Sequence, residues 1–448
     1  MVKLQKIFKE IFYILLVAPV LFLLVNEWPY LLVGSVLISI LIGFIFFIKK
    51  RSVTSFHSEL FAILGVIYVY FILSYFVSGQ PLSNLLSYQF LKYDGNFFFC
   101  YILFFIFSIS FSNFKKLADY YFKFIFSVFT VFSLIGITEY FLSSGFLMVH
   151  TQAGVGKLYF ALNFAHNATG SVYAVVCVSL LVFFLKEKIT KLKMLFLILL
   201  LINLSALLIT GSRASYLGFF GAALIVIWLH FKSIKKFSIT IGAFIVVTVP
   251  ILFLTGVYNR VIQILNFKGA STIIRFYIWE KAWYLFSQSP IFGTGYGRFN
   301  DVFNIDNGVF NIGKLRGYPG IVSFYMKQSF FFDSAHAHNS YLQFLTETGV
   351  IGLGLILLFW TLCIIRILKA YNSTKENFTG KVLLSSLASI FVLLILSFFE
   401  NYLSVTTVMV PISILVPISI GLYWEIYNKA NGINAISGKI FLCTVISF

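Results

Sequence analysis

The chain has 448 residues, of which 60% are apolar and only 11% are charged, and its mean hydropathy is +0.96. A soluble domain is about 45–50% apolar and about 25% charged, so this composition excludes a soluble globular protein and a disordered one. The net charge of +18 would suggest nucleic acid in a soluble protein, but in a membrane protein it more often records basic cytoplasmic loops.

Long apolar segments recur along the chain, and a helix that spans a bilayer needs roughly 20 such residues. We predict an all-α integral membrane protein, a single membrane domain over residues 1–448 with about twelve transmembrane helices. Between spans nine and ten, residues 256–338 should form a large periplasmic loop with short interfacial helices. The predicted spans are 11–25, 30–48, 59–77, 97–112, 122–142, 167–185, 194–210, 215–230, 237–255, 343–365, 382–399 and 405–424.

Basic residues orient this bundle. With the N-terminus in the cytoplasm, most of the 33 Lys and Arg residues fall on the cytoplasmic side, whereas the short outer loops hold only Lys92, Lys157 and Arg213. Long loops cross the membrane largely regardless of charge, so the short loops decide. The pattern predicts that both termini are cytoplasmic, and the net charge then gives no reason to expect nucleic acid as a partner.

The cysteines favour neither a disulfide framework nor a zinc site. None of them forms a C-x-x-C pair, and most fall inside predicted spans, which is typical of buried apolar cysteine. They are Cys100, Cys177, Cys363 and Cys443.

Arginine is rare in this Lys-rich chain, yet most arginines fall on the predicted outer side. Arginine grips phosphate with a planar fork and keeps its charge when partly buried. The outer set therefore suggests a phosphorylated ligand, although ordinary ion pairs within the loop are the alternative. The outer arginines are Arg213, Arg260, Arg275, Arg298 and Arg316, and the acidic residues that could pair with them are Glu280, Asp301, Asp306 and Asp333.

Two of these arginines have distinctive surroundings. Arg213 lies between two spans, in a short segment with almost no other charge, and a charge near the membrane edge tends to be functional unless it simply snorkels to the interface. Arg275 lies in an apolar segment suited to the membrane surface, and Trp279 follows four residues later. Stacking of Arg275 on Trp279 is the competing interpretation.

A histidine-containing segment precedes the tenth predicted span. His338 lies just before this span, and Gly349, eleven residues later, should fall nearly on the same helical face, with Gly352 close to it. Small residues there would let a neighbouring helix approach closely. A neutral His338 can act as a general base, and the alternatives are a capping histidine or a metal pair with His336, although no recognised ligand spacing is met.

Two further outer features carry weaker signals. Residues 290–299 are rich in glycine but follow no predicted strand, so we expect a tight turn that presents Arg298 rather than a nucleotide site. Phe330, Phe331 and Phe332 should dip into lipid or cover the core of the loop, with a groove for an isoprenoid tail as the alternative.

Taken in order, these residues resemble the O-antigen ligase and Wzy-type polymerase superfamily of bacterial membrane glycosyltransferases. The ligase signature is His, then Asn, Ser or Gln, nine residues, and Gly-x-x-Gly, Thr or Tyr, which is matched here by His338-Asn339 and Gly349-Val-Ile-Gly352. Arg213 matches the family's first essential arginine, and Asn167 resembles an Asn that opens another span. The resemblance covers about residues 160–365.

The resemblance implies transfer of a glycan from undecaprenyl diphosphate to an acceptor hydroxyl, outside the bacterial inner membrane. His338 would be the catalytic base and Arg213 and Arg275 would bind the diphosphate, with no metal and no cofactor. The same resemblance marks Asn339, Gly349, Gly352 and Asn167 as supporting residues. To these we add Arg298 and Arg316 as donor-binding residues and His336 as a further supporting residue.

Three functions remain open at this stage. An O-antigen ligase would use lipid A–core as acceptor, whereas a Wzy-type polymerase would use a second lipid-linked glycan, and the ligase signature favours the first. The third function is a flippase or transporter of lipid-linked sugars. Transporters usually place charges at mid-membrane sites in broken helices, whereas the polar residues here gather at one face.

Overall fold

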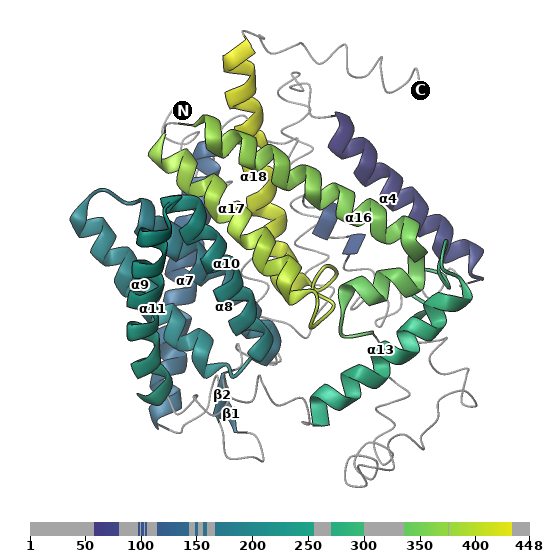
Figure 1. Ribbon diagram of the computed structural model, residues 1–448, viewed down its shortest axis with the longest axis horizontal. Helices are drawn as coiled ribbons and strands as arrows, with labels where there is room; N and C mark the ends of the chain where they lie inside the picture. Colours follow the sequence, from purple (N-terminus) through teal and green to yellow (C-terminus); the bar gives the residue numbers. More distant parts are fainter. Residues whose placement is uncertain are drawn as a thin grey trace, which may run out of the picture.

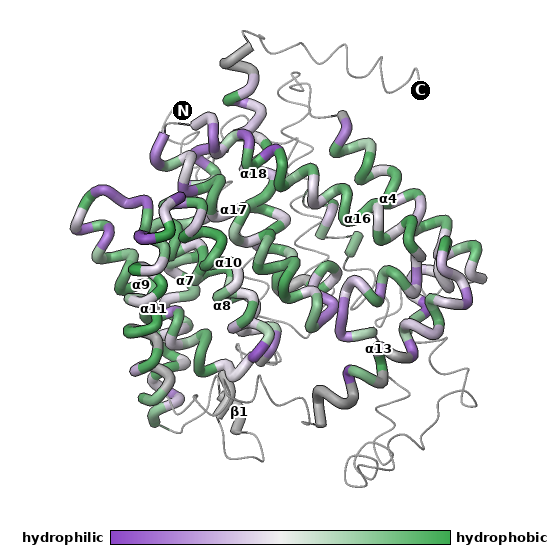
Figure 2. The backbone as a smooth tube through the Cα atoms, viewed as in Figure 1, coloured by the Kyte–Doolittle hydropathy of each residue, from purple (hydrophilic) through white to green (hydrophobic). Residues whose placement is uncertain are grey.

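The structure is a computed structural model that describes residues 58–79, 97–98, 100–102, 104, 114–142, 148–150, 156–158, 166–254, 270–299, 336–374 and 376–431. Eight helices within these ranges are long and apolar enough to cross a membrane. The chain is therefore a helical, multi-pass integral membrane protein, as its composition predicts. Figure 2 shows the apolar colours along the middles of the helices and the polar colours at their ends and turns.

The described elements follow one another as long helices with short turns between many of them (Figure 1). They are α4 (Ser58–Val77), α7 (Phe114–Leu142), β1 (Met148–His150), β2 (Gly156–Leu158), α8 (His166–Lys186), α9 (Thr190–Ile209), α10 (Arg213–Phe231), α11 (Ile234–Leu254), α13 (Ala270–Gln288), α16 (Ser340–Ser373), α17 (Asn377–Leu396) and α18 (Thr406–Asn431).

The predicted spans agree with the described helices wherever the two can be compared. The eight helices that could cross a membrane are α4, α7, α8, α9, α10, α16, α17 and α18, and each coincides with a predicted span. The predicted span 237–255 corresponds to α11, which is not one of the eight. Spans 11–25 and 30–48, and most of 97–112, lie outside the described residues. Twelve spans and the extent of the loop 256–338 therefore stay predictions.

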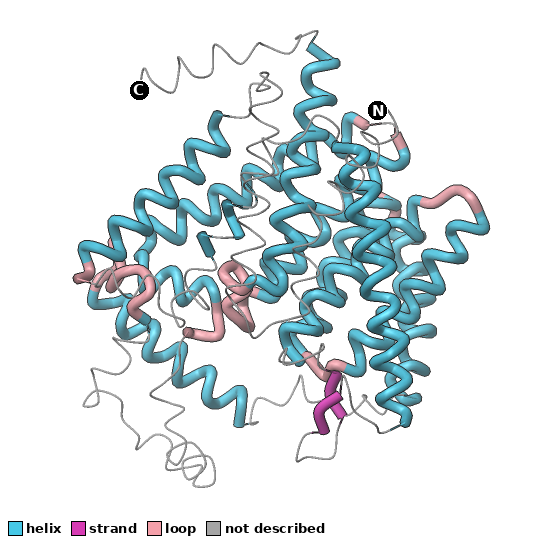
Figure 3. Tube along the Cα trace, turned by 180° about the vertical axis from the view of Figure 1, so that it is seen from behind, coloured by secondary structure: helices cyan, strands magenta, loops and turns pink. Residues whose placement is uncertain are grey.

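A small antiparallel hairpin adds the only strands among the described residues, which are otherwise helices and turns. It pairs β1 with β2, with Met148 opposite Leu158. The hairpin packs against α7, α8 and α9 and is visible in magenta in Figure 3. An all-α prediction misses it because three-residue strands carry too little alternation to register in a hydropathy pattern.

Helices α8, α17 and α18 form the buried centre of the described bundle, and α10 packs closely on α17. Glycine makes this approach possible. A Cβ at Gly218 would lie 3.0 Å from the side chain of Leu396, and one at Gly221 would lie 2.7 Å from Ile395. Small residues at helix interfaces are how membrane helices gain packing energy, since burial from lipid adds little. Helix α16 contacts α17 and α18 as well as α4 and α13.

Helix α16 is interrupted at Gly349, which has φ 64° and ψ −169°. The expectation that His338 and Gly349 share one face of a continuous helix is therefore wrong. The residues on either side of the break pair with the loop that follows α13. Thr294 N–H donates to Thr346 O (2.8 Å), Gly295 N–H donates to Glu347 O (2.9 Å) and Val350 N–H donates to Pro290 O (3.0 Å).

This geometry explains why both outer positions of the Gly-x-x-Gly element are glycine. A Cβ at Gly349 would collide with the carbonyl oxygen of Ile291, and its positive φ disfavours other residues. A Cβ at Gly352 would collide with the side chain of Thr348 and lie 3.1 Å from the ring of Tyr70 on α4. The close approach expected at Gly352 is thus present, whereas at Gly349 the close neighbour is a loop.

Candidate active site

The histidine segment is fixed by the start of α16. Asn339 is the N-cap, and its side-chain oxygen accepts hydrogen bonds from the backbone N–H groups of Tyr341 (3.0 Å) and Leu342 (3.1 Å). Such a cap satisfies N–H groups that the first turn leaves without partners. His338 immediately precedes the cap and has φ 49°, an uncommon value for a residue with a side chain.

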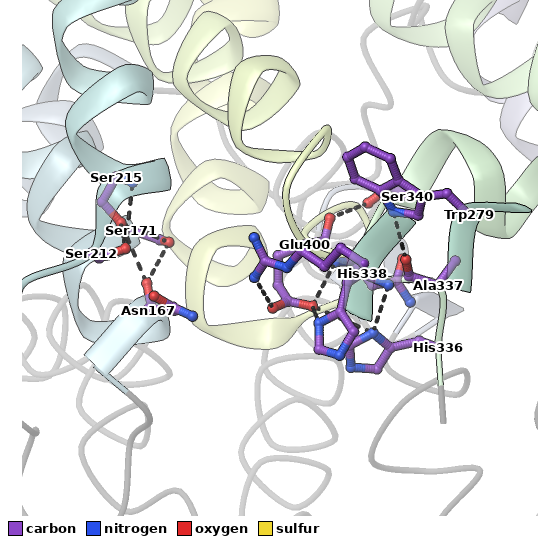
Figure 4. A network of polar contacts seen from close by, with 12 residues as sticks. Asn167, Ser171, Ser212, Ser215, Trp279, His336, Ala337, His338, Ser340 and Glu400 are labelled. Atoms are coloured by element: carbon purple, nitrogen blue, oxygen red, sulfur yellow. Dashed lines mark hydrogen bonds and ion pairs between the residues drawn. The ribbon is translucent and has the colours of Figure 1, made fainter. Parts of the chain in front are cut away.

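Glu400 lies against this segment, although it comes from the turn that follows α17. Its Oε1 lies 2.7 Å from Nδ1 of His338. Ser340 ties the two segments together, because its N–H donates to Ser397 O (2.8 Å) and its hydroxyl donates to Glu400 O (3.1 Å). Figure 4 shows His336, His338 and Glu400 converging, and Figure 3 shows the two loops side by side near the centre.

Glu400 is an anion at neutral pH. Burial would raise the pKa of its carboxyl group, but His338, His336 and Arg275, together with the hydrogen bond to His338, lower it to about 2. The guanidinium NH2 of Arg275, on α13, lies 3.8 Å from Oε2 of Glu400. An ionised Glu400 accepts the Nδ1 proton of His338, which leaves Nε2 of that ring with the lone pair that a general base needs.

His336 is neutral at the same pH. Burial lowers the pKa of its imidazole to about 4, and the nearby charges of His338 and Arg275 act in the same direction against Glu400. Its Nδ1 accepts the backbone N–H of His338 (3.2 Å). The same Nδ1 lies 3.3 Å from Glu400 Oε1. Since a neutral Nδ1 that accepts a hydrogen bond carries no proton, we treat this second approach as proximity and not as an ion pair.

Trp279 contacts the histidine segment and not Arg275. Its indole N–H donates to the backbone oxygen of Ala337 (3.0 Å), and its ring packs on Phe276 at 5.7 Å. Arg275 points its guanidinium toward Glu400. Neighbours four residues apart on α13 thus reach the same site by different contacts.

A second polar group lies at the adjoining ends of α8 and α10. The hydroxyl of Ser171 donates to Asn167 O (2.7 Å), and the hydroxyls of Ser212 and Ser215 lie 2.7 Å apart. Ser212 also caps α10, where its side chain accepts the N–H of Ser215. This turn places Arg213, half-buried, as the first residue of α10.

Tyr402 joins the two polar groups. It is buried, and its hydroxyl hydrogen bonds with Ser171. Burial raises the pKa of its phenol, and the charge of Glu400 raises it further. The structure therefore brings Arg275, His336, His338 and Asn339 together and connects them through Tyr402 to Ser171 beside Asn167, at the end of the bundle where Arg213 begins α10.

Other predicted site residues lie elsewhere or outside the described part of the chain. NH1 of Arg298 donates to Ser78 O (2.9 Å) at the end of α4, a favourable place for a cation because carbonyl groups are exposed there. The glycine turn thus presents Arg298 to a helix end, and we leave it out of the site. Arg316, Asp301, Asp306, Asp333 and Phe330–Phe332 lie outside the described residues.

Three donor atoms at the site could also hold a metal ion. One atom each from His336, His338 and Glu400 lies within 4.8 Å of the others. Two imidazoles and a carboxylate suit zinc, yet Arg275 competes for the same carboxylate. The donor set therefore calls for a direct test with a chelator.

Glu400 is the main residue that the sequence interpretation missed. Its signal was present, because Glu400-Asn401 interrupts an apolar stretch just after the predicted span 382–399, where the topology places a short outer turn. An ionisable residue at such a position is a site candidate by default.

Comparison with known proteins found one matching family. Residues 195–357 match a family model described as O-antigen ligase, a range that runs from α9 into α16 and includes Arg213, Arg275 and His338. Over these residues the chain resembles the O-antigen ligase/Wzy superfamily. Members of this superfamily are glycosyltransferase-like membrane enzymes, and their substrates are lipid-linked glycans. Glu400 lies beyond the matched range. No curated protein matches the chain.

Proposed function

We propose that this protein transfers a glycan from undecaprenyl diphosphate to an acceptor hydroxyl at the periplasmic face of the bacterial inner membrane. The first candidate acceptor is lipid A–core, which makes the protein an O-antigen ligase. The observation that carries the proposal is the contact between His338 and an ionised Glu400, with Arg275 beside it, inside or adjoining the matched ligase domain.

The proposed reaction is one displacement. Nε2 of His338 takes the proton of the acceptor hydroxyl while the acceptor oxygen forms a bond to the anomeric carbon. The bond from that carbon to the diphosphate oxygen breaks, and its electron pair leaves with undecaprenyl diphosphate. Arg275 and Arg213 stabilise the negative charge that develops on the leaving group. Because the new bond forms on the face opposite the broken one, the anomeric configuration inverts.

The proposed chemistry needs no metal, since the diphosphate is already a good leaving group. Glu400 keeps the imidazole of His338 oriented and stabilises its charge once it has taken the proton, as in other carboxylate–histidine pairs. Asn339 supports this arrangement by fixing the start of α16.

A Wzy-type polymerase is the second candidate, because the same residues would serve a lipid-linked glycan as acceptor and the superfamily includes both activities. A flippase for lipid-linked sugars is the third. It is less well supported, because the described charges gather around one histidine suited to proton transfer.

A deletion strain separates these functions. We expect that deletion removes polymer from lipid A–core while polymer remains on the lipid carrier, as judged by gel electrophoresis of lipopolysaccharide and of extracted lipids. A core that carries a single repeat would point to the polymerase instead. Glycan trapped on the cytoplasmic side would contradict both enzyme functions.

The same strain tests the chemistry. Wild-type protein should restore transfer, with or without a chelator, whereas His338→Ala should reach the membrane in normal amounts and restore at least 10²-fold less, the usual contribution of a general base. Near-normal transfer by His338→Ala would exclude His338 as the base. Loss of wild-type transfer in chelator would favour a metal at His336, His338 and Glu400.

A further inference from the structure

The backbone of Ala337 is held from both sides. Its N–H donates to Oε1 of Gln343 (2.7 Å), and its carbonyl oxygen accepts the indole N–H of Trp279 (3.0 Å). The first bond fixes the peptide plane between His336 and Ala337, and the second fixes the plane between Ala337 and His338. Ala337 itself is fully buried.

This region of the backbone needs outside support. His338 has φ 49°, and a residue with a side chain in this region stores strain that only surrounding contacts can maintain. The N–H of His338 contributes one contact, to Nδ1 of His336 (3.2 Å). Asn339 holds the following turn, and the two bonds to Ala337 hold the segment on its other side.

Gln343 is itself oriented. Its Nε2 donates to Oε1 of Glu347 (2.9 Å), one turn further along α16, and the same oxygen accepts the N–H of Phe299 (3.0 Å). Because the amide nitrogen is engaged by Glu347, the amide oxygen is the atom that faces Ala337. Gln343 and Glu347 are each only 1% exposed, so water does not replace these partners at low cost.

We propose that Trp279 and Gln343 are positioning residues for His338. In this proposal they act by fixing the two peptide planes that precede His338, whose imidazole lies against Glu400. This inference rests on the proposed function, in which His338 is the base. It predicts a loss in the chemical step with little change in substrate binding, because only the orientation of the base is lost.

Trp279→Phe is the sharpest variant, since it removes the donor N–H and keeps an aromatic ring against Phe276. The assay uses purified protein in lipid vesicles, with the lipid-linked glycan that accumulates in the deletion strain as donor and the core lipid of that strain as acceptor. We expect kcat to fall about 10-fold or more and KM for both substrates to stay within about twofold. Trp283→Phe is the matched control, because Trp283 lies one turn further along α13 and is 59% exposed. It should behave as wild type.

A second variant and a double-mutant test distinguish a loss of positioning from a general loss of folding. Gln343→Met should show the same split between kcat and KM. In a Glu400→Gln background, where the imidazole has already lost its anionic partner, Trp279→Phe should lower kcat by less than about twofold, because residues that act as a unit are not additive. Independent effects that multiply, or a change in KM alone, would overturn the proposal.

The outcomes also separate this inference from the proposed function. If His338→Ala abolishes transfer while Trp279→Phe and Gln343→Met keep a normal kcat, only the positioning role is wrong. If His338→Ala transfers normally, the proposed function loses its base, and the effect of Trp279→Phe must have another origin.

Discussion

Glu400 and His336 show how one buried carboxylate organises charge at this site. Glu400 stays ionised although burial opposes it, because His338, His336 and Arg275 surround it. His336, in the same surroundings, stays neutral. The pKa values of the two groups are both shifted downward, and this leaves a single anion to orient the base at neutral pH.

These shifts make the folded protein sensitive to acid. His336 binds a proton near pH 6.5 when unfolded but only near pH 4 when folded, so its contribution to stability is complete above about 6.5 and is lost as the pH falls toward 4. Between pH 7 and pH 5 this loss is about 2 kcal/mol. Glu400, with a folded pKa of about 2, keeps its contribution to stability above pH 4.5 and loses it only below that value, so it changes little in this interval. Thermal unfolding in lipid nanodiscs at pH 7 and pH 5 measures the effect.

His336→Asn provides the comparison for this measurement. It removes the titrating ring and should make the midpoint of unfolding less dependent on pH between 7 and 5. An equal dependence in the variant and the wild type would show that other groups cause the acid sensitivity.

At this scale the sequence reveals residues whose spacing carries a motif. His338 and Asn339 are candidates on this ground, whereas Arg275 and Arg213 are candidates because each is a charge in apolar surroundings. Glu400 could not be paired with His338 from the sequence, because the contact depends on how α17 packs against α16. Arg298 shows how side-chain chemistry alone can suggest a site residue that the structure places elsewhere. An arginine suits phosphate, but this one bonds to the carbonyl end of α4.

The break in α16 is the feature of a single element with the widest effect. Gly349 interrupts the helix, and the backbone groups that the break leaves without helical partners bond to residues 290–295. Inside a membrane protein, an unpaired backbone group would cost several kcal/mol, so the loop satisfies a requirement of the helix. The broken helix and the loop after α13 are therefore one structural unit.

Gly349→Ala should destabilise this unit. Alanine at φ 64° is strained, and its Cβ would collide with the carbonyl oxygen of Ile291. We expect a loss of at least about 2 kcal/mol, seen as a lower midpoint of thermal unfolding and a lower yield of folded protein.

Gly354→Ala is the matched control in the same helix. A Cβ there meets nothing within 4 Å, and alanine favours a helix interior by roughly 0.5–1 kcal/mol over glycine. This variant should be as stable as the wild type or slightly more stable. Similar behaviour of the two variants would show that the break at Gly349 is not required.

Hydropathy predicts where the long helices lie but not how they are interrupted. The predicted span 343–365 falls within α16. Its hydropathy is averaged over many residues, so the average does not reveal the non-helical φ of Gly349. The small hairpin of β1 and β2 is missed for a related reason, since each strand has only three residues.

At the scale of the whole molecule, a Lys-rich turn and the candidate active site lie at opposite ends of the same helices. Helices α8, α9 and α10 follow one another through short turns, so the Lys-rich turn between α8 and α9 lies at the end opposite the turn that precedes Arg213. The positive-inside rule assigns the Lys-rich end to the cytoplasm. The proposed periplasmic location of His338 follows from this orientation.

Thiol labelling of intact spheroplasts tests this orientation. In a Cys443→Ser background, Gln288→Cys should react with a membrane-impermeant maleimide, whereas Lys188→Cys should react only after permeabilisation. Both positions are exposed, and Cys100, Cys177 and Cys363 are buried. The reverse pattern would place the Lys-rich end, and not the site, in the periplasm.

The two points that flank residues 300–335 have a consequence for how such proteins can vary. Phe299, before the segment, bonds to Glu347, and Ala337, after it, bonds to Gln343, one turn away on the same helix. The two ends are thus fastened to neighbouring points of α16 whatever lies between them. A change in the length of the chain between these two points should therefore leave His338 in place.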